Sequence, residues 1–216
     1  MEAISSPFKI ILGSSSMSRR KILTEMGYEF TVMADAIVSK LRTIDGQLGN
    51  AESTILIAAD TAEAILNRLP IGDDIKEADP TVLITADQVV VYEGAIREKP
   101  SSKEEAWQFI KGYSGGHCAT VGSVFVTNIN TGFRKGESDR VEDLMDIVRA
   151  LQIYFHEIPD EVIEKLVEEG TVLYVAGGLI IEHPLILPYI KQVVGTMDSV
   201  MGLSKALTEK LIKEAL

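Results

Sequence analysis

The chain alternates between short apolar runs and segments whose apolar residues recur at helical spacing. Apolar runs at residues 9–12 and 81–92 predict two buried strands. Apolar positions three and four residues apart predict helices, of which the first covers residues 18–26. Further predictions are a strand at 28–33, helices at 51–69, 101–112, 141–151, 159–169 and 204–216, a short strand at 153–156, and a hairpin formed by 118–128 and its continuation at 131–132. Strands and helices alternate early and antiparallel signals follow residue 112, so the pattern predicts an α/β protein with a mixed sheet.

Composition and charge narrow the class of protein. The chain has 216 residues, of which 46% are hydrophobic, and its formal net charge is −11. A negative net charge disfavours binding to nucleic acid or to anionic membranes through the overall field. We expect no transmembrane helix and no secretory signal, because no apolar run is long enough and the first residues lack a basic and an apolar region. The single cysteine, Cys118, excludes an internal disulfide, so a cytoplasmic protein is expected. Together with the negative charge, this predicts a protein without nucleic-acid or membrane partners.

The first candidate site follows the strand at residues 9–12. A turn containing Ser14 and Ser16 leads into the first helix, where Arg19 and Arg20 follow within one turn. Backbone N–H groups at the start of a helix attract anions, and an arginine can hold the same anion with two hydrogen bonds. The alternative is an ordinary strand–turn–helix with a serine N-cap and two solvated arginines.

Asp87 is the second candidate, because it interrupts the apolar run at residues 81–92. An unpaired buried carboxylate costs several kcal/mol, so this residue either faces a cleft or is paired. In a cleft it could bind a divalent cation or activate a water molecule. The alternative is an aspartate at a turn or a sheet edge.

Two later charged residues are weaker candidates when each is taken alone. Lys99, fixed by the following proline, could hold a phosphate, and Glu182 could accept hydrogen bonds from a base edge. For both, a solvated surface position is the alternative. His156 and His183 have no partners at metal-ligand spacing and are read as structural or surface residues, and Cys118 is read as a packed residue rather than a nucleophile.

Together these residues resemble the Maf family of nucleoside triphosphate pyrophosphatases. The resemblance extends from about residue 8 to residue 216 and combines motifs that are individually weak. The matching positions are Ser14, Ser16, Arg19, Arg20, Ile22-Leu23, Gly27 and Phe30, then Ala86-Asp87-Gln88-Val89-Val90, Lys99-Pro100, Ser114-Gly115, Ala176-Gly177 and Met201-Gly202-Leu203.

The resemblance implies a fold and a reaction. It implies one domain over residues 1–216 with an elongated, two-lobed, inosine-triphosphatase-like fold and a central cleft. The implied reaction is hydrolysis between the α- and β-phosphates of a nucleoside triphosphate with Mg²⁺ or Mn²⁺, in a protein that could be a homodimer. By position, Asp87 resembles the acid that activates water, and the residues that resemble substrate ligands are Ser14, Ser16, Arg19, Arg20, Gln88, Lys99 and Glu182.

The sequence departs from the family pattern in two regions. Ile37 and Val38 occupy the positions of an acidic pair, and Thr61 occupies that of a lysine. Residues 143–152 resemble an insertion. These departures motivate the alternative that the chain is a catalytically impaired homologue that binds a nucleotide or a partner protein.

The base of the substrate is the last question that the resemblance raises. The family divides between enzymes for dTTP, UTP and related pyrimidine nucleotides and enzymes for 7-methyl-GTP. Gln88 and Glu182 resemble the second group, whereas Ser18 matches neither.

Overall fold

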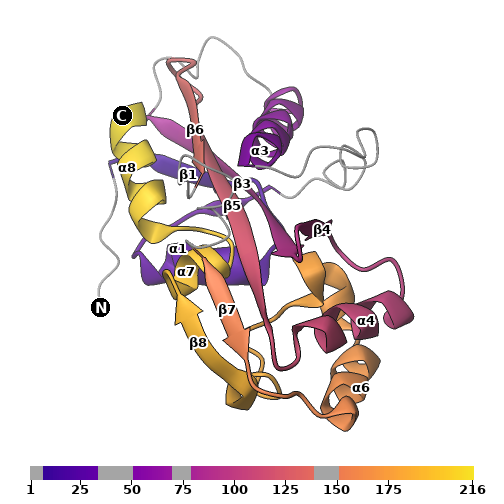
Figure 1. Cartoon of the computed structure of the whole chain (residues 1–216). Helices are drawn as coiled ribbons and strands as arrows, with labels where there is room; N and C mark the ends of the chain where they lie inside the picture. The colour runs from indigo at the N-terminus through magenta and orange to yellow at the C-terminus, as the bar shows by residue number, and fades with distance from the viewer. Residues whose placement is uncertain (1–6, 34–50, 70–78, 139–150) are drawn as a thin grey trace. The chain divides into compact units, whose positions relative to one another are not determined.

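The computed structural model describes residues 7–33, 51–69, 79–138 and 151–216 (Figure 1). The strands are β1 (Lys9–Leu12), β2 (Thr31–Val32), β3 (Thr81–Tyr92), β4 (Ala95–Arg97), β5 (His117–Asn128), β6 (Arg134–Ser138), β7 (Gln152–Phe155) and β8 (Ile190–Val194). The α-helices are α1 (Met17–Glu25), α3 (Ala51–Leu66), α4 (Lys103–Tyr113), α6 (Asp160–Glu169), α7 (Met197–Val200) and α8 (Lys205–Ala215). Three 3₁₀-helices follow α6, namely η2 (Thr171–Tyr174), η3 (Ala176–Gly178) and η4 (Leu187–Tyr189).

The strands form a mixed sheet in the order β2-β1-β3-β5-β7-β8, with β4 paired to β3 and β6 paired to β5. The predicted α/β class with a mixed sheet is therefore confirmed. The chain divides into two compact units. Unit 1 comprises Met1–Asp87, Gly122–Asp139 and Gly202–Leu216, and unit 2 comprises Gln88–Val121 and Arg140–Met201. The long strands β3 and β5 each contribute residues to both units.

In unit 1, parallel pairing places β1 between β2 and β3. The register aligns Ile11 with both Thr31 and Leu83. The inner face of α3 packs against β3 through an apolar cluster that includes Ile65 and Leu83, both nearly inaccessible to solvent. A helix with a broad apolar stripe requires such a partner, which accounts for the Ala- and Ile-rich pattern of α3.

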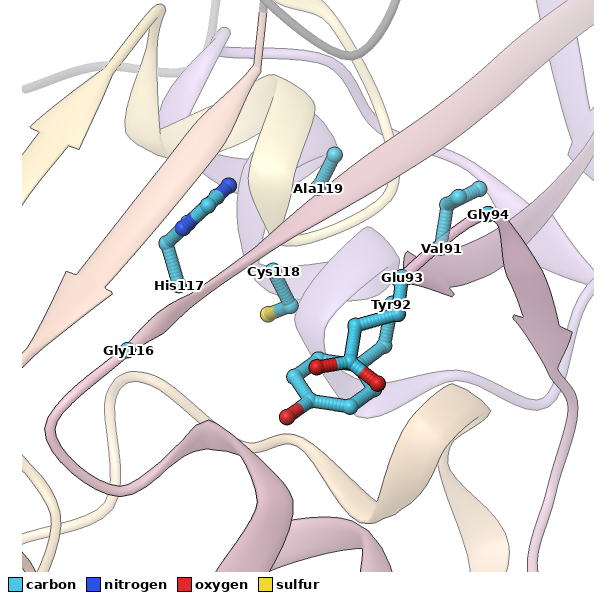
Figure 2. Close-up of a pocket in the computed structure, with 8 residues that line it drawn as sticks. All are labelled: Val91, Tyr92, Glu93, Gly94, Gly116, His117, Cys118 and Ala119. Atoms are coloured by element: carbon cyan, nitrogen blue, oxygen red, sulfur yellow. The ribbon is translucent and has the colours of Figure 1, made fainter.

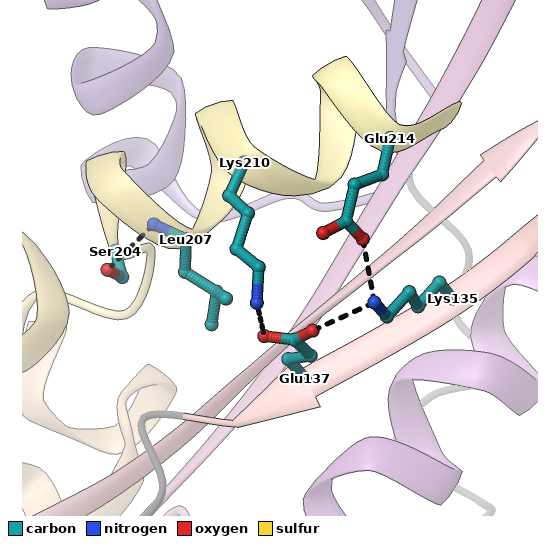
Figure 3. Close-up of polar contacts among 6 residues, drawn as sticks. All are labelled: Lys135, Glu137, Ser204, Leu207, Lys210 and Glu214. Carbon is teal, nitrogen blue, oxygen red and sulfur yellow. Dashed lines mark hydrogen bonds and ion pairs between the residues drawn. The ribbon is translucent and has the colours of Figure 1, made fainter. Parts of the chain in front are cut away.

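Helix α8 is tied to β5 and β6 by polar contacts within unit 1. The side chain of Asn128 donates a 2.7 Å hydrogen bond to the carbonyl oxygen of Ala215. Figure 3 shows ion pairs that join Lys135 to Glu214 at 2.7 Å and Lys210 to Glu137 at 2.6 Å. The last helix of the chain thus belongs to the same unit as the first strand.

In unit 2, strand β7 pairs antiparallel with both β8 and β5. Helices α4 and α6 pack in this unit, and Lys111 on α4 forms a 2.6 Å ion pair with Asp160 at the start of α6. The core includes Tyr113, Phe155 and Ile163, none of them more than 2% exposed. The rings of Tyr113 and Phe155 are stacked with centroids 6.0 Å apart.

The predicted elements agree with the structure best where the apolar run is continuous. Strands β1 and β3 have the predicted bounds. A hairpin forms from β5 and β6 as predicted, but its second strand begins at Arg134, because residues 131–132 lie in the connecting turn. The strand predicted at 28–33 is shorter, because only Thr31–Val32 pair with β1. The helix predicted to continue to residue 69 ends at Leu66. Strands β4 and β8 and helix α7 were not predicted, since three to five residues carry too little periodicity.

Several predictions fall on residues outside those that the structure describes. These are the helix at 141–151 apart from its last residue, the substitutions at Ile37 and Val38, and most of the proposed insertion at 143–152. The last residue of that segment, Gln152, is the first residue of β7 and pairs with Ala119 and Val194. No helix among the described residues is both long and apolar enough to cross a membrane.

Candidate active site

The turn between β1 and α1 lies close to β3 within unit 1. The N–H of Gly13 donates a 2.8 Å hydrogen bond to the carbonyl oxygen of Ile84. A Cβ atom at Gly13 would lie 2.6 Å from side-chain atoms of both Ile65 and Thr85. Only glycine fits this close approach, and the serines that follow are held near the end of the buried part of β3.

The serines of this turn organise the start of α1. The N-cap is Ser16, whose hydroxyl oxygen accepts from the N–H of Arg19 at 3.4 Å. Ser14 is buried, and its hydroxyl oxygen accepts from the N–H of Ser16 at 3.2 Å. The predicted serine N-cap is therefore confirmed, and Ser14 and Ser16 are placed together.

Arg19 connects three segments of unit 1. Its Nη1 donates to the hydroxyl oxygen of Ser14 at 3.1 Å and to the carbonyl oxygen of Ala86 at 2.8 Å, while its Nε donates to the carbonyl oxygen of Gly202 at 2.9 Å. The alternative of a solvated arginine is therefore wrong for this residue. Arg20 is not part of this group: its Nε is buried and has no hydrogen-bond partner among the described residues. Neighbouring helical residues point in directions about 100° apart, which explains the difference.

Asp87 follows Ala86 directly in β3. It is 3% exposed and ends a run of six buried residues that begins at Val82. An exposed turn or edge position, which the sequence left open, is thereby excluded. The Arg19 hydrogen bonds thus bring the serine turn to the backbone next to this buried carboxylate.

Thr61, at the position where the family pattern has a lysine, is packed inside unit 1. It is 3% exposed, and its hydroxyl donates a 2.7 Å hydrogen bond to the carbonyl oxygen of Ile57 one turn earlier in α3. A nearby hydrogen bond of the same length joins the hydroxyl of Thr85 to the carbonyl oxygen of Ala58. Position 61 is therefore filled by a satisfied neutral side chain.

Gln88 begins unit 2 and is held there by the residues of α7. Its Nε2 donates to the carbonyl oxygens of Ser199 at 3.1 Å and Val200 at 2.8 Å. An amide nitrogen has two hydrogens, so both donors of this side chain are engaged. Any hydrogen bond from a ligand to this side chain would have to be accepted by Oε1.

Lys99 and Glu182 come from two segments of unit 2 that are bonded to each other. Lys99 is exposed and Glu182 is half-buried. The carbonyl oxygen of Glu98, just before Lys99, accepts a 2.7 Å hydrogen bond from the N–H of Gly177 in η3. The glycine turn that precedes Glu182 therefore lies against the lysine segment.

His156, His183 and Cys118 occupy the surface or structural positions expected of them. His156 is exposed, and Nε2 of His183 lies 2.9 Å from a carboxylate oxygen of Glu169. A small pocket, drawn in Figure 2, is lined by residues 91–94 and 116–119, none of which was a predicted site residue. Cys118 in its wall is 1% exposed, and burial raises the pKa of its thiol to about 12. A thiol in that state is a poor nucleophile at neutral pH.

Sequence reasoning missed the backbone acceptors that hold these side chains. The carbonyls of Gly202, Val200 and Glu98 carry no side-chain signal, and each lies more than 75 residues from its donor in the sequence. The one available hint is glycine itself: Gly177 and Gly202 both adopt positive φ angles, of 62° and 102°.

Comparison with known proteins places the chain in a family. The chain is 35% identical over 207 residues to the 7-methyl-GTP pyrophosphatase of Dictyostelium discoideum, covering 95% of this chain and 96% of the relative. It is 29% identical to a nucleoside triphosphate pyrophosphatase of Salinispora tropica, covering 96% and 84% of the two chains. It is 28% identical to a dTTP/UTP pyrophosphatase of Alkaliphilus oremlandii, covering 90% of each. The sequence pattern of the Maf-like protein family matches residues 9–215, and the chain belongs to this family.

Proposed function

We propose that this protein hydrolyses nucleoside triphosphates between the α- and β-phosphates, releasing a nucleoside monophosphate and pyrophosphate. The observation that carries the proposal is the pair of hydrogen bonds from Arg19 to Ser14 and to the carbonyl oxygen of Ala86. These two bonds connect the serine turn, which can bind an anion, to the residue that precedes Asp87 in β3. The names of the relatives, all pyrophosphatases acting on nucleoside triphosphates, support the same reaction.

The serine turn and the start of α1 are proposed to receive phosphate oxygens. A nine-residue helix presents unpaired N–H groups and the positive end of its dipole at this end. Ser14, Ser16 and Arg19 surround that end through the hydrogen bonds described above. Arg20, on the same helix, would add positive charge toward a triphosphate. The exposed Lys99 of unit 2 is proposed as a further phosphate ligand.

Asp87 is proposed to act as the general base. Its carboxylate would accept a proton from the attacking water while the water oxygen forms a bond to the α-phosphorus. The bond from that phosphorus to the bridging oxygen breaks, and pyrophosphate leaves with the electron pair. Phosphoryl chemistry of this kind requires mainly an aligned nucleophile and compensation of negative charge.

A divalent cation fits the chemistry of this donor set. Mg²⁺ is commonly bound through one or two carboxylates together with substrate phosphates, and Asp87 is a buried carboxylate in this unit. Asp87 would be the protein ligand, with phosphate oxygens completing the coordination. The cation, when bound, would neutralise charge that develops on the phosphates.

For the base, we propose a guanine-type edge such as that of 7-methyl-GTP. Glu182 can only accept hydrogen bonds when ionised, and Gln88 can offer only Oε1 because both hydrogens of its Nε2 are engaged. Acceptors of this kind suit the N–H donors of guanine. The relative from Dictyostelium discoideum, named a 7-methyl-GTP pyrophosphatase, supports this choice.

A panel of nucleoside triphosphates tests the proposal directly. The purified chain is incubated with 7-methyl-GTP, GTP, UTP, dTTP and CTP in the presence of Mg²⁺, and pyrophosphate and monophosphate are measured. The expected result is equal amounts of both products, with 7-methyl-GTP the best substrate. Release of inorganic phosphate and a diphosphate would contradict cleavage at the α–β position.

A second candidate is a protein that binds nucleotides without turning them over. It is favoured by Thr61, whose packed, neutral side chain stands where the family pattern has a lysine. Equilibrium dialysis with the same nucleotides separates the two candidates. Tight binding without pyrophosphate release, with Mg²⁺ or Mn²⁺ present, would establish the second.

A further inference from the structure

The turn formed by η3 is held through both backbone polar groups of one residue, Gly177. The N–H of Gly177 donates to the carbonyl oxygen of Glu98 at 2.7 Å, and the carbonyl oxygen of Gly177 accepts from the hydroxyl of Tyr113 at 2.9 Å. Tyr113 is completely buried, so its hydroxyl has little access to solvent as an alternative partner. Hydrogen bonds shielded from water in this way fix a segment more firmly than exposed ones.

The backbone conformation of Gly177 and the space around it both require a glycine at this position. Its φ of 62° lies in the left-handed region, which a residue with a side chain seldom adopts. A Cβ atom there would lie 2.7 Å from both the hydroxyl oxygen of Tyr113 and the side chain of Val90. The turn can approach Tyr113 only because it has no side chain at this position.

Arg97 packs against the ring of Tyr113 and holds the segment that leads to Lys99. Its guanidinium carbon lies 4.0 Å from the ring centre of Tyr92, 4.7 Å from that of Phe109 and 4.9 Å from that of Tyr113. Its Nη1 also donates a 2.8 Å hydrogen bond to the carbonyl oxygen of Phe109. A planar cation enclosed by aromatic faces has little freedom, so the backbone from Arg97 toward Lys99 begins from a fixed point.

From these contacts we infer that Tyr113 and Arg97 are positioning residues for substrate binding. They hold the Lys99 segment and the glycine turn before Glu182 in one register, so that a phosphate-binding cation and a base-reading carboxylate keep a constant separation. The inference rests on the proposed function, since it assigns the roles of Lys99 and Glu182. It adds residues that touch neither substrate nor metal.

The inference predicts that Tyr113 and Lys99 are energetically coupled in substrate binding. If Tyr113 acts in part by placing Lys99, loss of the Tyr113 hydroxyl raises KM more while the lysine is present than after it has been removed. Residues that act independently give additive effects, whereas residues in one network do not. A residue that only stabilises the fold would lower the melting temperature without such dependence on Lys99.

The test is a double-mutant cycle on the full chain. Tyr113→Phe, Lys99→Ala and the double variant are compared for KM and kcat with 7-methyl-GTP and Mg²⁺, and Tyr154→Phe serves as the control. Tyr154 lies on β7 and its hydroxyl bonds to Gln152, away from the turn. Arg97→Lys, which keeps the charge but loses the planar stack, is the second variant. Hydrogen exchange of a peptide covering residues 175–179 reports on the turn itself.

The expected result for Tyr113→Phe is a KM about threefold to tenfold higher, the range of one neutral hydrogen bond, with kcat changed by less than about twofold. In the Lys99→Ala background, Tyr113→Phe raises KM by a smaller factor, because only the effect through the turn before Glu182 remains, and the turn exchanges faster in the Tyr113→Phe single variant. Arg97→Lys shifts KM in the same direction, and Tyr154→Phe resembles the wild type. An unchanged KM, or an equal increase in both backgrounds, overturns the inference.

If the wild type releases no pyrophosphate, it is the proposed function that fails. The exchange measurement then still decides whether Tyr113 holds the turn. Faster exchange in Tyr113→Phe supports that part of the inference, and unchanged exchange overturns it.

Discussion

Nη1 of Arg19 lies 2.8 Å from the carbonyl oxygen of Ala86, the residue that precedes Asp87 in β3. The arginine therefore acts on the geometry of the proposed catalytic carboxylate through the backbone, in addition to any contact with phosphate. Its two other acceptors, Ser14 and Gly202, belong to segments far apart in the sequence. The sequence alone treats Arg19 and Lys99 as equivalent phosphate ligands. Because of these hydrogen bonds, we expect substitution of Arg19 to affect stability as well as activity.

Arg19→Ala should reduce both stability and activity, while Lys99→Ala should reduce activity alone. Removing Arg19 leaves part-buried acceptors without their charged donor, and we expect a loss of about 2–3 kcal/mol in the free energy of unfolding. Lys99 is exposed, so its truncation should change stability by less than about 0.5 kcal/mol. Urea denaturation combined with KM for the triphosphate checks both. Equal stability of the two variants would argue against the structural role of Arg19.

Asp87→Asn should abolish turnover and leave the fold intact. The amide is nearly isosteric with the carboxylate but cannot take a proton from water, and we expect kcat to fall by about 10²–10⁴-fold. Circular dichroism and the melting temperature provide the check on folding. A variant that keeps a rate near that of the wild type would remove Asp87 from the role of general base.

Thr61→Lys should destabilise unit 1. The sequence alone suggests that restoring the family lysine, together with acids at Ile37 and Val38, raises activity. The structure favours a different outcome at position 61, because Thr61 is 3% exposed and its hydroxyl is satisfied. Burying an ammonium group there should cost about 1–3 kcal/mol or more of stability. Leu56→Lys on the same helix, where the side chain is 56% exposed, is the matched control and should be nearly neutral. A folded and faster Thr61→Lys protein would show that the position can open toward substrate.

Glu182→Gln should change the preference for the base. The amide no longer accepts from two guanine donors, so we expect kcat/KM for 7-methyl-GTP to fall by about tenfold or more relative to UTP. Both substrates are measured side by side, which cancels any general loss of activity. A constant ratio would assign base selection to other residues, with Gln88 the next to test.

The ion pairs of Glu137 should make the stability of unit 1 depend on pH. The hydrogen bond from Lys210, opposed by burial and supported by Lys135, holds the pKa of Glu137 below its ordinary value. A carboxylate whose pKa is lowered by folding stabilises the protein above its unfolded pKa, and this contribution is lost as the pH falls through the folded value.

We therefore expect Glu137→Gln to be about 0.5–1 kcal/mol less stable than the wild type at pH 7, with the difference shrinking as the pH falls through the lowered pKa of Glu137. High salt should also reduce the difference. Glu209→Gln, which breaks an exposed pair with Lys213 within α8, is the control and should have a smaller effect. Urea denaturation at pH 3.5 and pH 7 provides the comparison.

Local patterns predicted the parts of the structure that depend on neighbouring residues. The spacing of Ser102 and Glu105 predicts an N-cap at Ser102, and Ser102 is the N-cap of α4, accepting from the N–H of Glu105 at 3.1 Å. The reciprocal contact differs by one residue, because the carboxylate of Glu105 accepts from the N–H and hydroxyl of Ser101. A capping motif fixes the start of a helix more reliably than the partner of each atom.

The candidate site depends on contacts that no local pattern encodes. Asp87 is identified because a carboxylate in an apolar strand is unusual, and Ser14 and Ser16 because they lie in the turn that leads into the first helix. The burial of Thr61 follows from the packing of α3, and the contacts of Arg19 with Ala86 and Gly202 follow from how distant segments meet. Periodicity specifies the buried face of an element, but it does not specify which element covers that face.

Unit 1 draws on β1 near the beginning of the chain and α8 at its end, with parts of β3 and β5 between them. During synthesis, the first strand and the serine turn therefore emerge long before the helix that supplies the Asn128–Ala215 and Lys135–Glu214 contacts. The chain must hold an incomplete apolar surface until α8 has been synthesised, which slows folding and lengthens exposure to aggregation. Demand for chaperones should therefore be greatest for the nascent chain of this protein and fall sharply once α8 has left the ribosome.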